Sequence, residues 1–311
     1  MTTTSGRTVF VAGGSGTIGV PLVRALVGAG HKVFATTRSA SKQALLWDLG
    51  ATPVVVDALN AAALERAVRA ARPTHVIHQL TALPKTAPKS AADLEPTNRL
   101  RDEGTRNLLR AAVAAGARRF IGGSFALIGA GVMPEAPQAG LDRAREAIQS
   151  MESQILGAAR DGTIEGIVLR YGLFYGPGNP ATDDMLDRVR RRRLPRVRGD
   201  AGKLPYIHLD DAVSATVAAI DHGASGSVYD IVDDRPASFS EMVDVMAELA
   251  HAPRPFTVPA WLPRLVAPYM ARLLALQAPL SNAAAKQDLQ WTPRFPSYRE
   301  GLRQTIRLAA A

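Results

Sequence analysis

The stretch from residue 8 to residue 19 constrains the fold of this chain more than any other. The apolar run Thr8–Ala12 predicts a buried strand, and Val20–Gly30 predicts a helix. Between them lies the segment Gly13–Gly19, in which glycines recur at every third position. A strand, a glycine-rich turn and a helix in this order predict the first unit of a dinucleotide-binding fold.

Each of the three glycines at this spacing has a separate physical role. Gly13 allows the sharp turn out of the strand, Gly16 lets the backbone approach a pyrophosphate, and Gly19 lets the helix pack closely on the strand. The free amides of the first helical turn then face the phosphates. The predicted contacts are Gly13, Ser15, Gly16, Thr17, Ile18 and Gly19.

The end of the second predicted strand indicates which dinucleotide binds. A site selective for NAD(H) would place an acidic residue near Thr37 to hold the ribose hydroxyl, and none is present. Arg38, with the hydroxyls of Thr37 and Ser39, suits a 2′-phosphate because the planar guanidinium matches phosphate oxygens. The sequence therefore favours NADP(H) over NAD(H), the alternative being a solvated arginine.

Apolar runs alternate with helical patterns through the first half of the chain, which predicts a parallel sheet with helices on both faces. We expect a Rossmann-like, doubly wound α/β fold with a smaller C-terminal substrate-binding domain. The expected boundaries are 1–170 for the dinucleotide-binding domain and 171–311 for the substrate-binding region, which partly returns to the sheet. The predicted strands are Thr8–Ala12, Lys32–Thr37, Pro53–Val56, Thr74–His78, Arg118–Gly123 and Ile164–Arg170, and the predicted helices include Glu103–Ala115 and Asp142–Arg160.

Composition excludes several classes of chemistry. The 311 residues include no cysteine, which excludes disulfides, thiolate zinc sites and cysteine nucleophiles. His75 and His78 lie on one strand at odd spacing and point to opposite faces, so we expect no metal site. The segment Pro259–Leu280 carries prolines and arginines that a membrane span would not tolerate. We read it as helices over a pocket or a subunit contact, and we expect a cytoplasmic protein.

The formal net charge is +9, and basic residues concentrate in Arg190–Arg193. A solvated helix face explains this run, and so does an anionic substrate, for which Arg198 is the best single candidate. Nucleic acid is disfavoured because no aromatic residues are interleaved with the arginines. The expected partners are a small-molecule substrate and a phosphate-rich cofactor, with no membrane.

Beyond the glycine turn, the sequence resembles the extended short-chain dehydrogenases/reductases of the NAD-dependent epimerase/dehydratase type. The resemblance covers nearly the whole chain, and it implies a homodimer. It places Asp57 and Ala58 near the adenine, Leu80, Thr81 and Ala82 along the central cofactor, and Tyr171 and Leu173 near the nicotinamide. Its landmarks are Gly13–Gly19, Val56–Leu59, Val76–Ala82, Gly104–Leu109, Arg170–Gly178, His208–Ala212 and the tail from Ser281 to Leu302.

The catalytic pair that the resemblance implies, a tyrosine with a lysine four residues later, is missing. Counted back from Glu152, the tyrosine position falls near Ala144 and the lysine position near Ile148. The chain therefore resembles an atypical member of that family. Candidates for the missing proton donor are Tyr171 and Tyr175.

Ser124, at a strand end, is a candidate hydrogen-bond donor to the substrate, although Phe125 aligns better with the catalytic serine. His208 is a candidate substrate contact or a structural histidine, and Asp210 is the expected cap of the following helix. Arg145 and Glu146 are read either as solvated helix charges or as site residues.

These features favour an NADP(H)-dependent oxidoreductase, or a related epimerase or dehydratase, that acts on a small carbonyl or hydroxyl compound. One alternative is a non-catalytic NADP-binding sensor, which the loss of the catalytic pair also predicts. Another is a redox-neutral enzyme that keeps the cofactor as a structural element.

Overall fold

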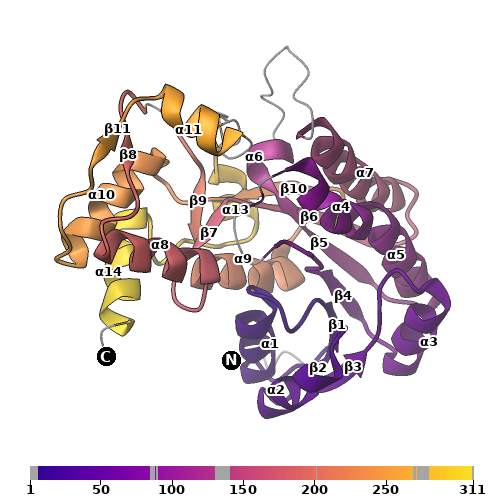
Figure 1. Ribbon diagram of the computed structural model, residues 1–311. Helices are drawn as coiled ribbons and strands as arrows, with labels where there is room; N and C mark the ends of the chain where they lie inside the picture. The colour runs from indigo at the N-terminus through magenta and orange to yellow at the C-terminus, as the bar shows by residue number, and fades with distance from the viewer. Residues whose placement is uncertain are drawn as a thin grey trace.

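The structure, a computed structural model, describes residues 6–84, 88, 90–129, 141–200, 202–268, 271 and 280–309. Figure 1 shows an α/β part built around a sheet and a smaller part built mainly from the later segments.

Seven parallel strands form the sheet, in the order β10-β6-β5-β4-β1-β2-β3. Because β1 pairs with both β2 and β4, the chain winds outward from β1 in two directions, and in sheets of this kind ligands bind beyond the carboxyl ends of the strands. The strands are β1 (Thr8–Ala12), β2 (Lys32–Thr37), β3 (Thr52–Val55), β4 (His75–His78), β5 (Arg119–Phe125), β6 (Glu165–Tyr171) and β10 (Val228–Ile231). The expected Rossmann-like parallel sheet is confirmed.

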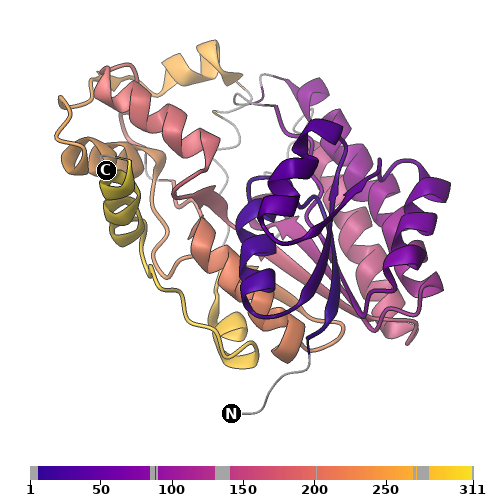
Figure 2. The same cartoon turned by 90° about the horizontal axis from the view of Figure 1, so that it is seen from below.

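Helices cover both faces of the sheet, as Figure 2 shows from below. Val9 and Val11 face one layer while Phe10 and Ala12 face the other, because successive side chains of a strand point to opposite sides. One layer contains α1 (Gly19–Gly28) and α9 (Leu209–His222), and the other contains α3 (Ala61–Ala71), α5 (Thr105–Ala114) and α7 (Leu141–Arg160). All four β1 side chains named here are fully buried, as in a sheet covered on both faces.

One helical rod leads into α5 along the second layer. It consists of η2 (Ala91–Leu94), α4 (Glu95–Arg99), the π-helical turn η3 (Leu100–Gly104) and then α5. The sequence predicted a helix from Glu103 onward, but the structure begins the rod earlier, at a capping box that Ser90 and Asp93 form.

Arg119 fixes α9 to the sheet. Its guanidinium donates to the carbonyls of Ala219 and Ile220, at 2.8 and 2.7 Å, in the last turn of α9. It also pairs with Glu165 at 2.7 Å. The partial negative charge at a helix C-terminus favours a cation there by about 1 kcal/mol. This anchor holds β10, which follows α9, against β6.

The smaller part contains two short parallel pairs, β7 (Leu173–Tyr175) with β9 (Tyr206–His208) and β8 (Arg196–Val197) with β11 (Thr257–Val258). Apolar faces of α10 and α14 pack together in its core through Val243, Met246 and Leu302, among others. Its helices are α8 (Pro180–Arg190), α10 (Phe239–Leu249), α11 (Trp261–Val266) and α14 (Tyr298–Leu308), while α2 (Gln43–Asp48), α6 (Ala126–Gly129), α13 (Ala283–Asp288) and η1 (Ala40–Lys42) lie elsewhere along the chain.

The stretch Pro259–Leu280, read from the sequence as helices, contains α11, but its residues 269, 270 and 272–279 lie outside the described residues. Within the part of the chain that the structure describes, no helix is long and apolar enough to cross a membrane.

Candidate active site

The glycine turn between β1 and α1 has the shape of a phosphate cradle. Gly13 has φ +92°, and a Cβ on it would lie 2.6 Å from the carbonyl oxygen of Gln79. A Cβ on Gly19 would collide with the backbone of Gly13. A Cβ on Gly16, in contrast, would meet only the Gly13 carbonyl oxygen, at 3.2 Å. Protein packing thus requires glycine at 13 and 19, while the bare backbone at 16 leaves room for a ligand.

Polar groups gather where β2 ends beside this turn. Ser15 donates its hydroxyl to Thr37 Oγ1 at 3.1 Å, and the amide of Ser39 donates to the same oxygen at 3.2 Å. Arg38 is exposed next to them. Lys42, which the sequence reasoning missed, reaches back so that its Nζ lies 3.5 Å from the Ser15 carbonyl oxygen. Two cations and several hydroxyls therefore border the place expected for a 2′-phosphate.

The positions expected near the adenine follow β3. Asp57 accepts the Leu59 amide at 3.0 Å, so its carboxylate orders this turn. Ala58 is 4% exposed, and its carbonyl accepts the Asn107 side chain at 3.0 Å. Asn107 belongs to a landmark of the family resemblance, and the structure gives it the task of holding this loop.

His78 orders the segment that follows β4. Its Nδ1 accepts the Leu80 amide at 3.2 Å, and its Nε2 lies 3.0 Å from Thr105 Oγ1. Burial lowers the pKa of His78 to about 4, so the ring is neutral at pH 7. The Ala82 amide donates to Thr97 Oγ1 at 2.9 Å, which ties the end of the segment to α4. Thr81, which lies between Leu80 and Ala82 in the chain, is exposed to solvent.

Ser124 lies at the carboxyl end of β5, where its hydroxyl donates to Glu152 Oε1 at 2.6 Å. Glu152 also receives two hydrogen bonds from Arg170, at 2.9 and 2.6 Å. In this arrangement Ser124 can offer a substrate only its lone pairs, because its proton is already engaged. Phe125, the next residue, packs against an apolar cluster that α6 and α7 share with the smaller part.

The structure buries the hydroxyl of Tyr171 in the core. This residue is 3% exposed, and its hydroxyl accepts from the Gln79 side chain at 2.8 Å and lies 2.7 Å from Thr216 Oγ1. Burial raises the pKa of Tyr171 to about 12. Leu173, two residues later on β7, is half-buried.

Tyr175, the last residue of β7, is equally enclosed. Its hydroxyl donates to Asp233 at 2.9 Å, and burial, reinforced by that carboxyl, raises the pKa of Tyr175. Burial also raises the pKa of Asp233 to about 8. Both tyrosines that the sequence offered as proton donors therefore have their hydroxyls directed to protein partners.

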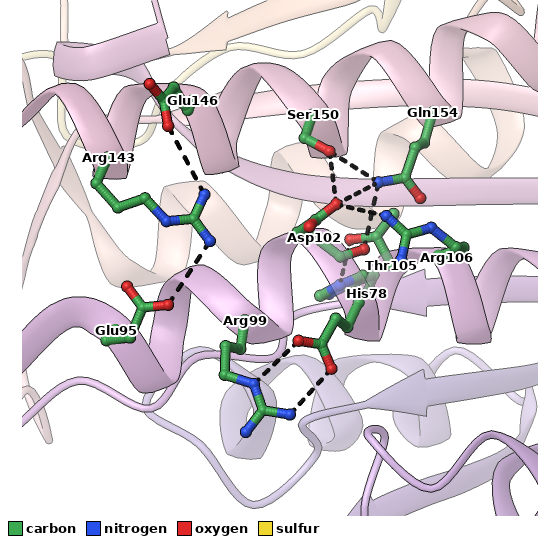
Figure 3. A network of polar contacts seen from close by, with 11 residues as sticks. His78, Glu95, Arg99, Asp102, Thr105, Arg106, Arg143, Glu146, Ser150 and Gln154 are labelled. Atoms are coloured by element: carbon green, nitrogen blue, oxygen red, sulfur yellow. Dashed lines mark hydrogen bonds and ion pairs between the residues drawn. The ribbon is translucent and has the colours of Figure 1, made fainter.

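The positions near which the sequence leads us to expect the tyrosine and lysine pair are apolar and buried. Ala144 and Ile148 on α7 are both 0% exposed and belong to an apolar cluster with Leu127 and Ile128. Arg145 pairs with Asp142 at 3.4 Å on the partly exposed side of the same helix. Glu146 pairs with Arg143 at 3.9 Å on that side as well, as Figure 3 shows. Arg145 and Glu146 therefore form ion pairs on the helix surface and do not replace the missing tyrosine and lysine.

His208 is completely buried, and it caps α9. Its Nδ1 accepts the Asp210 amide at 3.2 Å, so the prediction that Asp210 is the helix cap was wrong. The ring packs 4.2 Å from Phe295, measured between centroids. The reason is local: a histidine in extended backbone can reach the second amide of the helix just as an aspartate does.

Arg198 is exposed and lines a cavity of about 390 Å³ between β8 and the start of α10. Acidic and basic side chains share this cavity: Arg196, Arg198, Asp200, Lys203, Glu241 and Asp244. The arginine run at the end of α8 behaves differently. Arg191 pairs with Asp187 at 2.9 Å, and Arg188 with Asp184 at 2.8 Å, along an exposed face. These ion pairs fit the interpretation of the arginine run as a solvated helix face.

Comparison with known proteins places these features in context. The sequence matches the NAD dependent epimerase/dehydratase family over residues 9–232. It is 39% identical to a 3-diazoavenalumate denitrifying reductase from a Streptomyces species, over 94% of this chain and 98% of that protein. It is 26% identical to a UDP-glucose 4-epimerase from Vibrio cholerae, over 96% and 94% of the two chains.

Among solved structures, the fold superposes on the Thermus thermophilus UDP-glucose 4-epimerase in complex with NAD. The TM-score is 0.77 at 22% identity, and the match covers 96% of this chain and 97% of the other. At this identity, the likeness concerns the fold.

Proposed function

Because the chain belongs to the NAD-dependent epimerase/dehydratase family and is an enzyme of the short-chain dehydrogenase/reductase superfamily, we propose that it is an NADP(H)-dependent reductase acting on an aromatic diazonium that carries a carboxylate. The observation that carries this proposal is the complete burial, in an apolar cluster, of Ala144 and Ile148, near which the family resemblance leads us to expect the tyrosine and the lysine. The 39% identical reductase supports the substrate class, since its name describes nitrogen removal from a diazo compound that is the anion of an acid.

The chemistry of such a substrate explains why no acid is needed. A reduced nicotinamide, when bound, supplies a hydride. A ketone that accepts a hydride becomes an alkoxide and needs a proton from the protein. An aryl diazonium cation that accepts a hydride instead yields the arene and N₂, so charge and atoms balance without an added proton.

The glycine turn and the groups at the end of β2 would hold the dinucleotide. The exposed Arg38 and Lys42, with the hydroxyls of Ser39 and Ser41 2.7 Å apart, support a preference for NADP(H). The acidic residue that would bind the 2′-hydroxyl of NAD(H) is missing there.

For the substrate carboxylate, we propose Arg198 as a contact, because its side chain is exposed beside a cavity. His208 is a poorer candidate, since its ring is closed off by Phe295 and Tyr175. Ser124 supports the reaction indirectly, by linking β5 to Glu152. We also propose a cytoplasmic homodimer, in line with the cysteine-free composition and the family's usual assembly.

The test offers the purified protein two matched substrates with NADPH: an aromatic carboxylate bearing a diazonium group, and the same carboxylate bearing an aldehyde. The reduced-nicotinamide absorbance reports turnover, and chromatography identifies the arene. We expect oxidation of NADPH with the diazonium and little or none with the aldehyde. Preference for the aldehyde would contradict the proposal. Gly16→Val, which fills the open side of the phosphate cradle, is the control and should abolish turnover in either case.

A further inference from the structure

A buried polar face lies on the helical rod beside the end of β4. Asn98 in α4 is 1% exposed and Arg101 in η3 is 9% exposed. Thr97, which directly precedes Asn98, accepts the amide of Ala82, so this part of the rod adjoins the segment expected along the central cofactor. Arg101 also lies near enough to His78 to depress the pKa of that ring.

The rotation of the rod at this point is fixed by Asp102, as Figure 3 shows. Its carboxylate accepts hydrogen bonds from Ser150 on α7 at 2.7 Å and from Arg106 at 2.8 Å. Gln154, also on α7, donates to the Asp102 carbonyl at 3.2 Å. Asp102 thus points at α7, and the π-helical turn brings its neighbour Arg101 to the buried side. Such turns occur frequently at functional sites.

The buried amide of Asn98 has no hydrogen-bond partner among the described residues, which points to a ligand. Neither its Nδ2 nor its Oδ1 has a hydrogen-bond partner within the described residues, although both atoms are buried. A buried amide without partners is destabilising, so its presence indicates a group that binds there. The amide both donates and accepts, which matches the hydroxyls of a ribose.

Arg101 is a candidate for the cation that would hold the nicotinamide ribose when the lysine is missing. The family resemblance implies a lysine at position 148 that holds the nicotinamide ribose, and Ile148 cannot do so. The rod and α7 lie side by side: Glu95 pairs with Arg143 at 3.6 Å, and Asp102 meets Ser150 as described above. A cation on the rod can therefore bind a ligand at the same end of the sheet as a cation on α7 would.

We propose that Arg101 and Asn98 bind the nicotinamide half of the dinucleotide, Arg101 in place of the missing lysine. This inference rests on the proposed function only in requiring that the chain binds NADP(H). The charge of Arg101 also affects which redox state of the nicotinamide binds more tightly. The oxidised nicotinamide ring is positively charged and the reduced ring is neutral, so a buried guanidinium nearby favours the reduced form. The site then favours binding NADPH and releasing NADP⁺, as a reductase requires.

The test measures binding rather than turnover. Calorimetry determines the Kd of NADPH, of NADP⁺ and of 2′,5′-ADP, which lacks the nicotinamide half. For Arg101→Met we expect at least tenfold weaker binding of NADPH, unchanged binding of 2′,5′-ADP within about twofold, and a smaller preference for NADPH over NADP⁺. Arg101→Lys should restore part of the affinity. The matched control is Arg99→Met, on the exposed face of the same rod, which should change none of the three.

Asn98→Leu provides a second, independent readout. Removing an unpartnered buried amide should raise the thermal stability of the unliganded protein while it weakens NADPH binding, a combination that a purely structural residue does not give. Equal weakening of NADPH and 2′,5′-ADP, or NADPH binding that stays unchanged in Arg101→Met, would overturn the inference alone. Failure of the unmodified protein to bind any of the nucleotides would overturn the proposed function as well.

Discussion

Ser124 and Glu152 are joined by a short hydrogen bond, 2.6 Å from Oγ to Oε1, that links the end of β5 to the middle of α7. Arg170 on β6 completes the link, since it donates to both oxygens of the same carboxylate. The elements β5, β6 and α7 are thus held together by one buried carboxylate.

We predict that Glu152→Gln lowers the free energy of unfolding by about 3 kcal/mol, because it removes the carboxylate that forms an ion pair with the partly buried Arg170. Chemical denaturation followed by circular dichroism measures the change. Glu103→Gln, which removes an exposed partner of Arg99, is the control and should have little effect. If both variants were equally stable, the link would not contribute to the fold.

Tyr171→Phe separates a structural role from a catalytic one. The variant removes a hydroxyl that serves the side chains of Gln79 and Thr216, so we expect a loss of about 1–3 kcal/mol in unfolding free energy. The turnover number at a temperature where the variant is folded should stay within about twofold of the parent. A drop of a hundredfold or more with normal stability would make Tyr171 the proton donor and contradict the proposed mechanism.

Asp233 predicts an unusual dependence of stability on pH. Burial raises its pKa to about 8, against 3.8 ordinarily, so between these values the folded chain holds a proton that the unfolded chain has lost. The contribution of Asp233 to the free energy of unfolding is therefore fully present at low pH. It is lost as the pH rises through the pKa that Asp233 has in the folded chain. Asp233→Asn should raise the melting temperature more at pH about 9 than at pH about 5, since the amide mimics the protonated acid.

The neighbouring Asp234 makes a matched comparison. Although burial opposes it, hydrogen bonds from Asn282 and Lys286 hold the pKa of Asp234 below its usual range. Its contribution is present above the ordinary pKa and is lost only as pH falls. Asp234→Asn should therefore lower the melting temperature at neutral pH. An identical response of the two variants would refute both assignments.

Coenzyme preference depends on charges that only a phosphate can use. We predict that Arg38→Ala weakens NADPH about 30-fold, equivalent to about 2 kcal/mol for lost charge-assisted hydrogen bonds, while NADH binding stays nearly unchanged. Lys42→Ala should act in the same direction with a smaller effect, because its Nζ lies 3.5 Å from a backbone carbonyl as well. Fluorescence titration measures both. Tighter binding of NADH than of NADPH by the parent protein would contradict the preference.

The sequence predicted six strands of the sheet, all but β10, because strand patterns are local. The first strand, Thr8–Ala12, agrees exactly in its bounds, and the predicted strand at Ile164–Arg170 is observed one residue later, at Glu165–Tyr171. The π-helical turn Leu100–Gly104 carries no such pattern, since its geometry depends on Asp102 reaching α7.

The site was harder to predict than the fold. Gly13, Gly16 and Gly19 could be assigned because their spacing follows from backbone geometry alone. The environments of Tyr171 and Tyr175 could not, because their burial depends on partners 45 and 58 residues away in the chain, Thr216 and Asp233. For the same reason, the buried face of the rod became visible only in the folded chain.

The measurement that bears most directly on the central claim is the stoichiometry of a single turnover. Enzyme and NADPH are mixed with an aromatic diazonium carboxylate at several pH values between about 6 and 8, and NADPH oxidised is compared with N₂ released. The account predicts one NADPH per N₂, with a hydride-transfer rate that changes less than about threefold over this range, because no protein acid titrates in the step. Release of N₂ without oxidation of NADPH, or a rate that follows the titration of a single acid, would contradict it.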